Sequence, residues 1–374
     1  MKNIWNKQTS LGSPTGCTQE TWLRTTDSGI ESYDIDLYLG KKTDLLSLKK
    51  NLVDTIKAQL EYFKTTREEL YTDTEPVVNC PVTGIDTSLT TPLINIYGAE
   101  YVVTPDTGHV YVKNRPRKSA IDNFYLNNVT YAATYTDKAK AEERLNTIAV
   151  PWCNWVTKVY EKQYGKKPKR ILDIGSGAGH FIEACRRAGY EADGIELSES
   201  SREFAREIWG FDMDGRDFTK IASEYEGYDI VTFWGLLEHT PNPGSILKAA
   251  HDVVSKGDAG MVISKVPRAH SLSGAAQITN NTTIIRHMDP MGHIMLFSDA
   301  SAAELYVKEN FKPTAAWYYG MDVYETFMQI GNSTGNYSAL TNTSNFQMEL
   351  QQHIDNVRFS DGLTLVGIPQ NPKT

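Results

Sequence analysis

The chain has 374 residues, with 38 lysine and arginine residues against 46 aspartate and glutamate residues, and 40% of its residues are hydrophobic. This is an ordinary globular composition, and at roughly 150 residues per domain it predicts two or three domains with a substantial core. The net charge of −8 argues against a nucleic-acid-binding protein, because phosphate binding needs clustered lysine and arginine side chains.

The cysteines and the N-terminus indicate the cellular setting. Cys17, Cys80, Cys153 and Cys185 are far apart and show no paired spacing, so they predict neither a disulfide framework nor a metal site. The first residues lack the apolar run of a signal peptide, and no stretch approaches the roughly 18 apolar residues of a membrane span. We expect a soluble cytoplasmic protein that binds neither nucleic acid nor a membrane. The oligomeric state is not indicated.

The first 75 residues are predicted to form an arm and one helix. Residues 1–40 mix polar residues with isolated aromatics and predict an irregular arm. Between residues 45 and 70, apolar positions recur every three or four residues among lysine and glutamate, which is typical of an amphipathic helix.

Two similar turns stand out among the short β segments predicted for residues 76–113. Residues 80–84 and residues 104–108 each read x-Pro-x-Thr-Gly. A zinc ribbon has two Cys-x-x-Cys-Gly turns on facing hairpins, and three of the four ligand positions here are threonine. The pair is therefore either a zinc ribbon that has lost its metal or two unrelated Pro-Gly turns. We expect no bound metal.

A tyrosine-rich loop follows these turns and contains Tyr131 and Tyr135. We expect the two tyrosines to contact a substrate; the alternative is aromatic packing between domains. Residues 76–145 are thus predicted to be a degenerate zinc-ribbon-like and substrate-contacting region.

In residues 146–374, by contrast, predicted strands and helices alternate along the chain. This rhythm predicts a parallel sheet with helices on both faces and a ligand site at the carboxyl ends of the strands. Residues 331–346, rich in polar residues and glycine, predict a loop. The predicted strands are residues 170–174, 191–195, 228–233, 260–266, 314–319 and 363–368.

A glycine-rich turn between the first strand and its helix is the clearest motif. Glycines let the backbone turn sharply, and a helix N-terminus offers free N–H groups to a polar ligand. The third glycine comes one residue earlier than in a dinucleotide-binding G-x-G-x-x-G turn, and the carboxylate of Asp173 suits a ligand with an ammonium group. The predicted cofactor residues here are Asp173, Gly175, Ser176, Gly177, Gly179 and Phe181.

Acidic and aromatic residues follow the next strands in order. Glu196, beside Leu197, ends the second strand, where its carboxylate can accept hydrogen bonds from both ribose hydroxyls. Asp217 and Phe218 follow the third strand region and could hold an adenine amino group and ring. Trp234 follows the fourth strand.

These motifs together resemble the class I S-adenosylmethionine-dependent methyltransferases over about residues 165–374. The resemblance implies a Rossmann-like, seven-stranded α/β sheet whose last strand is antiparallel, preceded here by a smaller α+β N-terminal domain. It implies S-adenosylmethionine as the cofactor. By the same resemblance, Asp173 and the glycine turn hold the methionine part, Glu196 the ribose, Asp217 and Phe218 the adenine, and Trp234 forms the floor of the site.

A narrower resemblance is to bacterial methyltransferases with an N-terminal zinc-ribbon-like domain. It rests on the twin turns, the tyrosine-rich loop, Glu238-His239, the segment 287–298 and the segment 320–324. It implies a nucleotide-linked sugar or a related small metabolite as the methyl acceptor.

Methyl transfer needs an aligned acceptor and removal of its proton, and histidine titrates in the right range for the proton transfer. We therefore predict His239 as the general base, with Glu238 orienting either His239 or the acceptor. The alternative is that both residues are structural. His287 and His293 are predicted to contact the substrate.

Other functions stay open at this stage. The protein could be a non-catalytic S-adenosylmethionine-binding scaffold, or a methyltransferase acting on a quinone or natural product. A nicotinamide dehydrogenase is disfavoured by the glycine spacing and by Asp173.

Overall fold

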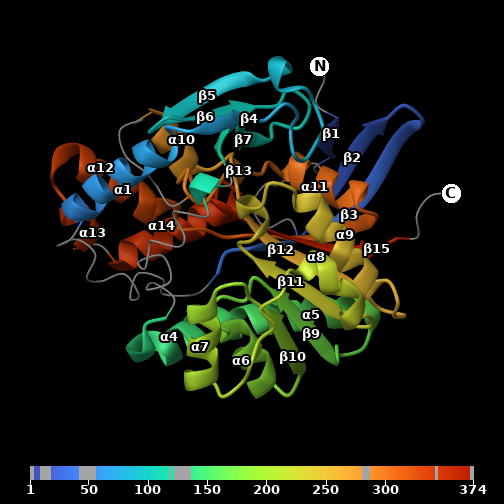
Figure 1. The fold of residues 1–374 in the computed structure, drawn as a ribbon. Helices are drawn as coiled ribbons and strands as arrows, with labels where there is room; N and C mark the ends of the chain where they lie inside the picture. Colours follow the sequence, from blue (N-terminus) through green and yellow to red (C-terminus); the bar gives the residue numbers. More distant parts are fainter. Residues whose placement is uncertain are drawn as a thin grey trace.

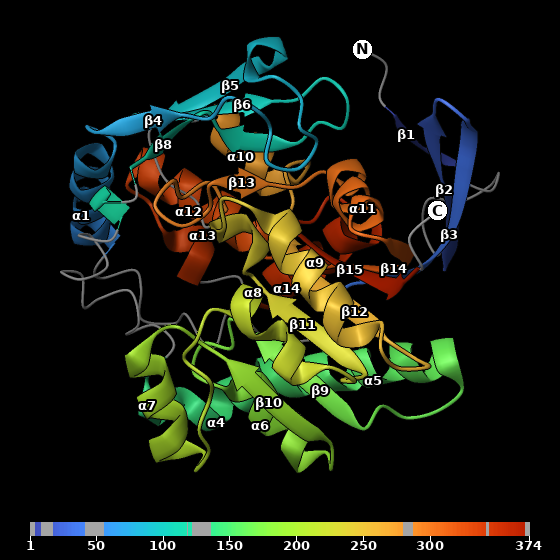
Figure 2. The same cartoon turned by 45° about the vertical axis from the view of Figure 1, so that its right-hand side comes forward.

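The computed structural model describes residues 4–8, 18–41, 56–117, 119–121, 136–279, 287–341 and 344–370. Tyr131 and Tyr135 lie outside these residues, so their predicted substrate contact stays a prediction. The smaller sheet, with β5 (Thr91–Ile96) and β6 (Ala99–Val103), lies at the opposite end of the molecule from β9 (Arg170–Ile174) and β10 (Glu191–Ile195) (Figures 1 and 2). Among the described helices, none is both long and apolar enough to cross a bilayer.

A nine-stranded mixed sheet forms the centre of the fold. Its four parallel strands β9, β10, β11 and β12 are followed by the antiparallel strand β15, as expected for the last strand. In spatial order the strands are β1 (Trp5–Gln8), β2 (Gln19–Thr26), β3 (Gly29–Leu39), β14 (Phe311–Tyr318), β15 (Gly362–Pro369), β12 (Met261–Pro267), β11 (Ile230–Trp234), β9 (Arg170–Ile174) and β10 (Glu191–Ile195).

Helices cover both faces of this sheet, which confirms the predicted α/β class. Successive strand residues such as Ile171 and Leu172 point to opposite faces, and each joins a different apolar cluster. Leu172 packs in the cluster that contains α9 and α11, whereas Ile171 packs in the one that contains α5 and α6. The helix bounds are α5 (Val150–Tyr164), α6 (His180–Arg187), α7 (Glu199–Ile208), α8 (Phe218–Ile221), α9 (Pro243–Val254), α10 (Leu272–Thr279) and α11 (Asp299–Lys308).

The six predicted strands are all present within three residues of their expected bounds. The resemblance implies seven strands, whereas the described sheet has nine. The third strand region contributes only an isolated bridge between Ile195 and Asp214, and three further strands come from the N-terminus.

The prediction of an irregular arm for residues 1–40 is wrong. β2 and β3 form an antiparallel hairpin, and β3 pairs in parallel with β14, with Leu39 opposite Tyr318. Tyr33, Ile35 and Leu37 are buried on one face of β3. Aspartates alternate with these apolar residues, which is the period of a half-buried strand.

A second, four-stranded sheet runs β13 (Met295–Leu296), β7 (Val110–Val112), β6 (Ala99–Val103) and β5 (Thr91–Ile96). β13 belongs to the C-terminal half of the chain and pairs with β7. Sheet pairing therefore crosses the expected boundaries between residues 1–75, 76–145 and 146–374, and that division stays a prediction. The remaining N-terminal elements are β4 (Thr74–Pro76), β8 (Asn114–Pro116) and α1 (Ile56–Leu70).

The twin turns have matching backbone geometry. In each, the N–H of the glycine donates to the carbonyl four residues earlier, Gly84 to Cys80 at 2.9 Å and Gly108 to Thr104 at 3.1 Å. Both glycines have positive φ, +78° and +69°, which glycine adopts without strain. The two turns are thus alike in backbone structure as well as in sequence. Descent from a zinc ribbon stays a prediction.

The loop predicted for residues 331–346 is largely helical. α12 (Asp322–Thr334), α13 (Ser338–Thr341) and α14 (Ser344–Asn356) occupy most of it. Gly335 ends α12 in a left-handed conformation, with φ +70°, so the glycine there stops a helix rather than marking a long loop.

A buried ion pair fastens the N-terminal hairpin to α11. The carboxylate of Glu304 accepts hydrogen bonds from Arg24 at 2.8 and 2.9 Å and from the indole Nε1 of Trp5 at 2.9 Å. The Glu304 side chain is only 3% exposed. Loss of one partner therefore leaves a desolvated charge behind.

We predict that Glu304→Ala lowers the free energy of unfolding by about 3 kcal/mol, because it leaves Arg24 without its principal anion. Urea denaturation at pH 7 measures this. Glu199→Ala, which removes an exposed ion pair with Arg202, is the matched control and should change the stability by less than about 0.5 kcal/mol. Equal small effects in both variants would contradict the anchoring role.

Candidate functional site

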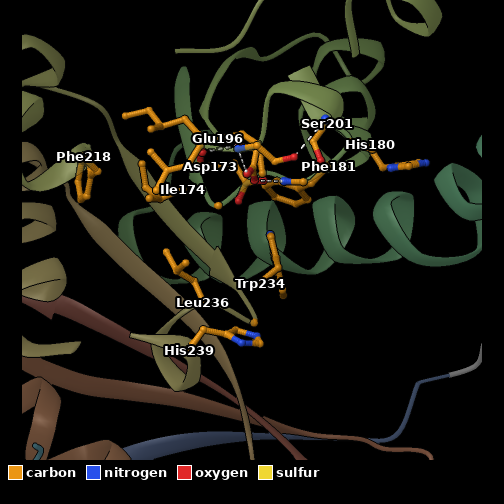
Figure 3. A pocket seen from close by; sticks show the side chains of 18 of the residues that line it. Asp173, Ile174, His180, Phe181, Glu196, Ser201, Phe218, Trp234, Leu236 and His239 are labelled. Atoms are coloured by element: carbon orange, nitrogen blue, oxygen red, sulfur yellow. Dashed lines mark hydrogen bonds between the residues drawn. The ribbon is translucent and has the colours of Figure 1, made fainter. Parts of the chain in front are cut away.

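A cavity of about 420 Å³ opens at the carboxyl ends of β9, β10 and β11. The chain runs from β9 to β10 on one side and returns to β11 on the other, so the cavity lies at the point where the strand order reverses. Open α/β sheets bind ligands at this position. Figure 3 shows Asp173 and Glu196 on one side of Trp234 and His239 on the other.

Ten of the eleven predicted cofactor residues line this cavity, and Gly179 does not. Gly179 has φ +75°, and a Cβ there would lie 2.9 Å from the ring of Phe211. The backbone conformation and the packing thus both favour glycine at this position, and its predicted cofactor contact stays a prediction. The ten lining residues are Asp173, Gly175, Ser176, Gly177, Phe181, Glu196, Leu197, Asp217, Phe218 and Trp234.

Asp173 is the most perturbed acid in the cavity. Its side chain is buried and accepts one hydrogen bond, from the Thr232 hydroxyl at 2.7 Å. Burial raises the pKa of Asp173 to about 8, and the nearby charge of Glu196 adds to the effect. A cationic group placed beside this carboxyl would restore its ionised form.

Glu196 is held rigidly at the end of β10. One of its carboxylate oxygens accepts the N–H of Gly177 at 2.7 Å, and the other accepts the N–H of Ser198 at 2.8 Å. Each carboxylate oxygen has a second lone pair, so both can still accept a ligand hydroxyl. These two bonds also tie the glycine turn to the next strand.

Asp217 and Phe218 form the far wall of the cavity. Asp217 caps α8 by accepting the N–H and the hydroxyl of Thr219 at 3.0 and 2.8 Å. The Thr219 hydrogen bonds lower the pKa of Asp217, which keeps the carboxyl ionised and able to accept an amino group. The Phe218 ring is 5% exposed and packs against Phe233.

Trp234 is part of an aromatic stack that the sequence did not indicate. Its ring lies 4.1 Å from that of Trp152, with an interplanar angle of 7°. The Trp234 Nε1 is buried and has no hydrogen-bond partner among the described residues. Trp152 comes from α5, and only the fold brings this helix to the cavity.

His180 and Arg144 also line the cavity and were not predicted. Burial lowers the pKa of His180 to about 4, so the ring is neutral at physiological pH. His180 directly follows the glycine turn, which was the available signal. Arg144 lies before the first predicted strand and carried no such signal.

Three predicted residues converge beyond Trp234. His239 and His293 each place Nε2 near Oε1 of Glu238, at 4.0 and 3.9 Å, and their rings meet edge to face at 4.8 Å. Glu238 is 3% exposed, and its Oε2 has no hydrogen-bond partner among the described residues. Burial raises the pKa of Glu238.

His239 is oriented by the backbone rather than by Glu238. Its Nδ1 lies 2.8 Å from the carbonyl oxygen of Gly292, which can only accept, so Nδ1 carries the hydrogen. Nε2 is left with a lone pair. At 4.0 Å, Glu238 does not hydrogen-bond to His239. In this structure Glu238 therefore does not orient His239 by direct contact.

His287 extends this group toward the buried Asp361. Its ring stacks on that of His293 with centroids 5.5 Å apart, and its Nε2 lies 3.4 Å from Asp361. Unlike His239, it does not line the cavity. His287 therefore supports His293, and substrate contact by either residue stays a prediction.

The group of Glu238, His239 and His293 has two chemical capacities. Its ligand atoms lie within 4.8 Å of one another and could hold a divalent metal ion. The free lone pair of His239 Nε2 could equally take a proton from an acceptor at the edge of the cavity. The expected absence of a metal stays a prediction.

Comparison with known proteins identifies the part of the chain that builds this site. A family described as "Methyltransferase domain" matches residues 141–316. Residues 141–316 are thus similar to methyltransferase domains. A ubiquinone biosynthesis O-methyltransferase of Pseudomonas aeruginosa is 33% identical over 147 residues, which are 37% of this chain and 62% of that protein. One from Bordetella avium is 32% identical over 133 residues, covering 34% and 54%.

The chain thus spans less than two thirds of the length of the curated relatives it matches. Among solved structures, the plantazolicin methyltransferase BamL has a TM-score of 0.43 at 14% identity, covering 67% of this chain and 94% of that one. A methyltransferase from Archaeoglobus fulgidus has a TM-score of 0.37 at 17% identity, covering 57% and 93%. The matched segment, residues 141–316, contains every described residue that lines the cavity.

We predict that binding of S-adenosylhomocysteine at pH 6.5 releases close to one proton per site. The ammonium group of the ligand should ionise Asp173, whose pKa of about 8 keeps it protonated in the free protein. Calorimetric titration in buffers of different ionisation enthalpy measures the proton count. Asp173→Asn should release none, and a buffer-independent heat in the unmodified protein would contradict the assignment.

The raised pKa of Asp173 also predicts how the free energy of unfolding changes with pH. The folded pKa of Asp173 lies above its unfolded value, so the folded state binds more protons between about pH 4 and pH 8. Its contribution to stability is complete below this window and is lost as the pH rises through it. The free energy of unfolding of Asp173→Asn should therefore fall less than that of the unmodified protein over the same range.

Proposed function

We propose that this protein transfers a methyl group from S-adenosylmethionine to a small-molecule acceptor, with His239 as the general base. The observation that carries the proposal is the free Nε2 of His239 at the edge of a cavity lined by Asp173, Glu196 and Trp234. The cofactor residues and the base lie on opposite sides of Trp234 (Figure 3). This arrangement suits a reaction between a bound cofactor and a second ligand.

The cavity residues fit the cofactor. Asp173 would hold its ammonium group, Glu196 its ribose hydroxyls, and Asp217 with Phe218 its adenine. When bound, S-adenosylmethionine supplies an electrophilic methyl group, which an aligned acceptor takes by in-line displacement. The work of the chain is to hold the acceptor in line and to accept its proton at Nε2 of His239, whose Nδ1–H is fixed on Gly292.

The proposed acceptor is a nucleotide-linked sugar or a polysaccharide precursor. Support comes from the sequence resemblance through the twin turns and the segment 287–298, which here supplies His293 beside His239. A second candidate is a quinone precursor, favoured by the names of the curated relatives. The stacked rings of Trp152 and Trp234 would suit either ring-shaped acceptor.

We predict that His239→Gln lowers turnover by about 10²- to 10⁴-fold, the usual contribution of a general base, without changing the affinity for S-adenosylhomocysteine. Release of S-adenosylhomocysteine is measured with a panel of sugar nucleotides and demethylated quinone precursors. His353→Gln, on the exposed side of α14, is the control and should keep full activity. Full turnover in His239→Gln would overturn the role of His239. Binding without release for any acceptor would favour the scaffold alternative.

A chelator separates the two capacities of the group formed by Glu238, His239 and His293. If His239 acts as a base, turnover should be unchanged after treatment with EDTA. A loss that is restored by adding a divalent cation would instead show that the three side chains bind a metal ion.

A further inference from the structure

Two lysines stand at the same edge of the large sheet as the cavity. Lys265 lies near the carboxyl end of β12, opposite Trp234 on β11. Lys41 follows the carboxyl end of β3, which pairs in parallel with β14, so it is delivered to the same edge. The N–H of Gly40 donates to Tyr318 at 2.8 Å, and Gly40 accepts from the Trp317 indole at 2.8 Å, which fixes the chain just before Lys41.

Both ammonium groups converge on one aromatic ring. The Nζ of Lys41 lies 5.5 Å from the centroid of Tyr319, and the Nζ of Lys265 lies 5.6 Å from it. Lys41 is also 5.1 Å from the ring of Trp152, which lines the cofactor cavity and donates to the Tyr319 hydroxyl at 2.7 Å. The lysines therefore lie one aromatic layer away from the cavity.

The charge of Lys41 is not balanced by a carboxylate among the described residues. Among the described residues, no carboxylate forms an ion pair with it, and its one charged neighbour is Lys265. Burial, with the charge of Lys265, lowers the pKa of Lys41 to about 7. Aromatic faces compensate only part of the cost of holding two cations together. An anion bound beside the Lys41 ammonium group would offset this repulsion and favour the charged form of Lys41.

Lys265 connects this place to the proposed base. Burial raises the pKa of Glu238, which lies beside His239 and His293, and the charge of Lys265 opposes a small part of this rise. A group held by Lys265 is thus close to the proton-accepting side of the site. The protein as a whole carries a net charge of −8, so local cations are needed to hold an anionic acceptor.

We propose that Lys41 and Lys265 form an anion subsite that binds a phosphate or carboxylate group of the methyl acceptor. This inference rests on the proposed function and narrows it to acceptors that carry an anionic group near the reacting atom. It also gives the N-terminal hairpin a role in the site, since β3 delivers Lys41. A nucleotide-linked sugar carries such a group in its pyrophosphate.

The test is calorimetric titration of the full chain, saturated with S-adenosylhomocysteine, with inorganic pyrophosphate in one arm and succinate in the other. We expect one of the two anions to bind with a stoichiometry of one, and the arm that binds distinguishes phosphate from carboxylate. Lys41→Met and Lys265→Met should weaken this binding at least tenfold, while Lys41→Arg should keep most of it. Lys166→Met, which removes an exposed lysine, is the matched control.

The titrations distinguish loss of the anion subsite from loss of the cofactor site. Binding of S-adenosylhomocysteine without binding of either anion overturns the anion subsite alone. An equal loss in Lys166→Met and Lys41→Met also overturns it, because the effect is then general charge. If S-adenosylhomocysteine itself does not bind the unmodified protein, the proposed function fails. Lys41→Gln serves as a second variant if Lys41→Met does not fold.

Discussion

The parallel pairing of β3 with β14 is the contact on which the arrangement of the rest of the molecule depends. It joins the first forty residues to the sheet that holds the cofactor cavity, with Leu39 opposite Tyr318. Glu304 reinforces the junction through Arg24 and Trp5. Because parallel strands end at the same edge, this one pairing carries the N-terminal chain to the place where ligands bind. In the proposed anion subsite, the hairpin would therefore supply Lys41 to the site as well as extend the sheet.

Much of the fold of residues 146–374 could be predicted, because its signals are local. Strand 170–174 ends at a glycine turn and strand 191–195 ends at Glu196, and the structure has both strands with the same bounds. β3 was missed although aspartates alternate with Tyr33, Ile35 and Leu37, so a usable signal was present. Its partner was not predictable, since β14 lies more than 270 residues further along the chain.

The features of the site likewise fall into those that the sequence could predict and those that depend on tertiary packing. Asp173, Glu196 and Trp234 follow strand ends, and the sheet brings strand ends together without further information. The carbonyl of Gly292 that sets the His239 tautomer, and the stack of Trp152 on Trp234, depend on tertiary packing between distant segments. At Gly179 the sequence motif did not reveal the close approach of the Phe211 ring, which also favours glycine there.

The added hairpin also changes the outer strands of the sheet. Without β1–β3, the eight-residue strand β14 would present an unpaired row of backbone groups, which is a template for association with other chains. With the hairpin in place, the outermost strand on that side is β1, four residues long and containing Asn6, Lys7 and Gln8. A short polar strand is a poor template. Residues 141–374, separated from the first forty residues of the chain, would thus carry an aggregation-prone edge that β1–β3 cover.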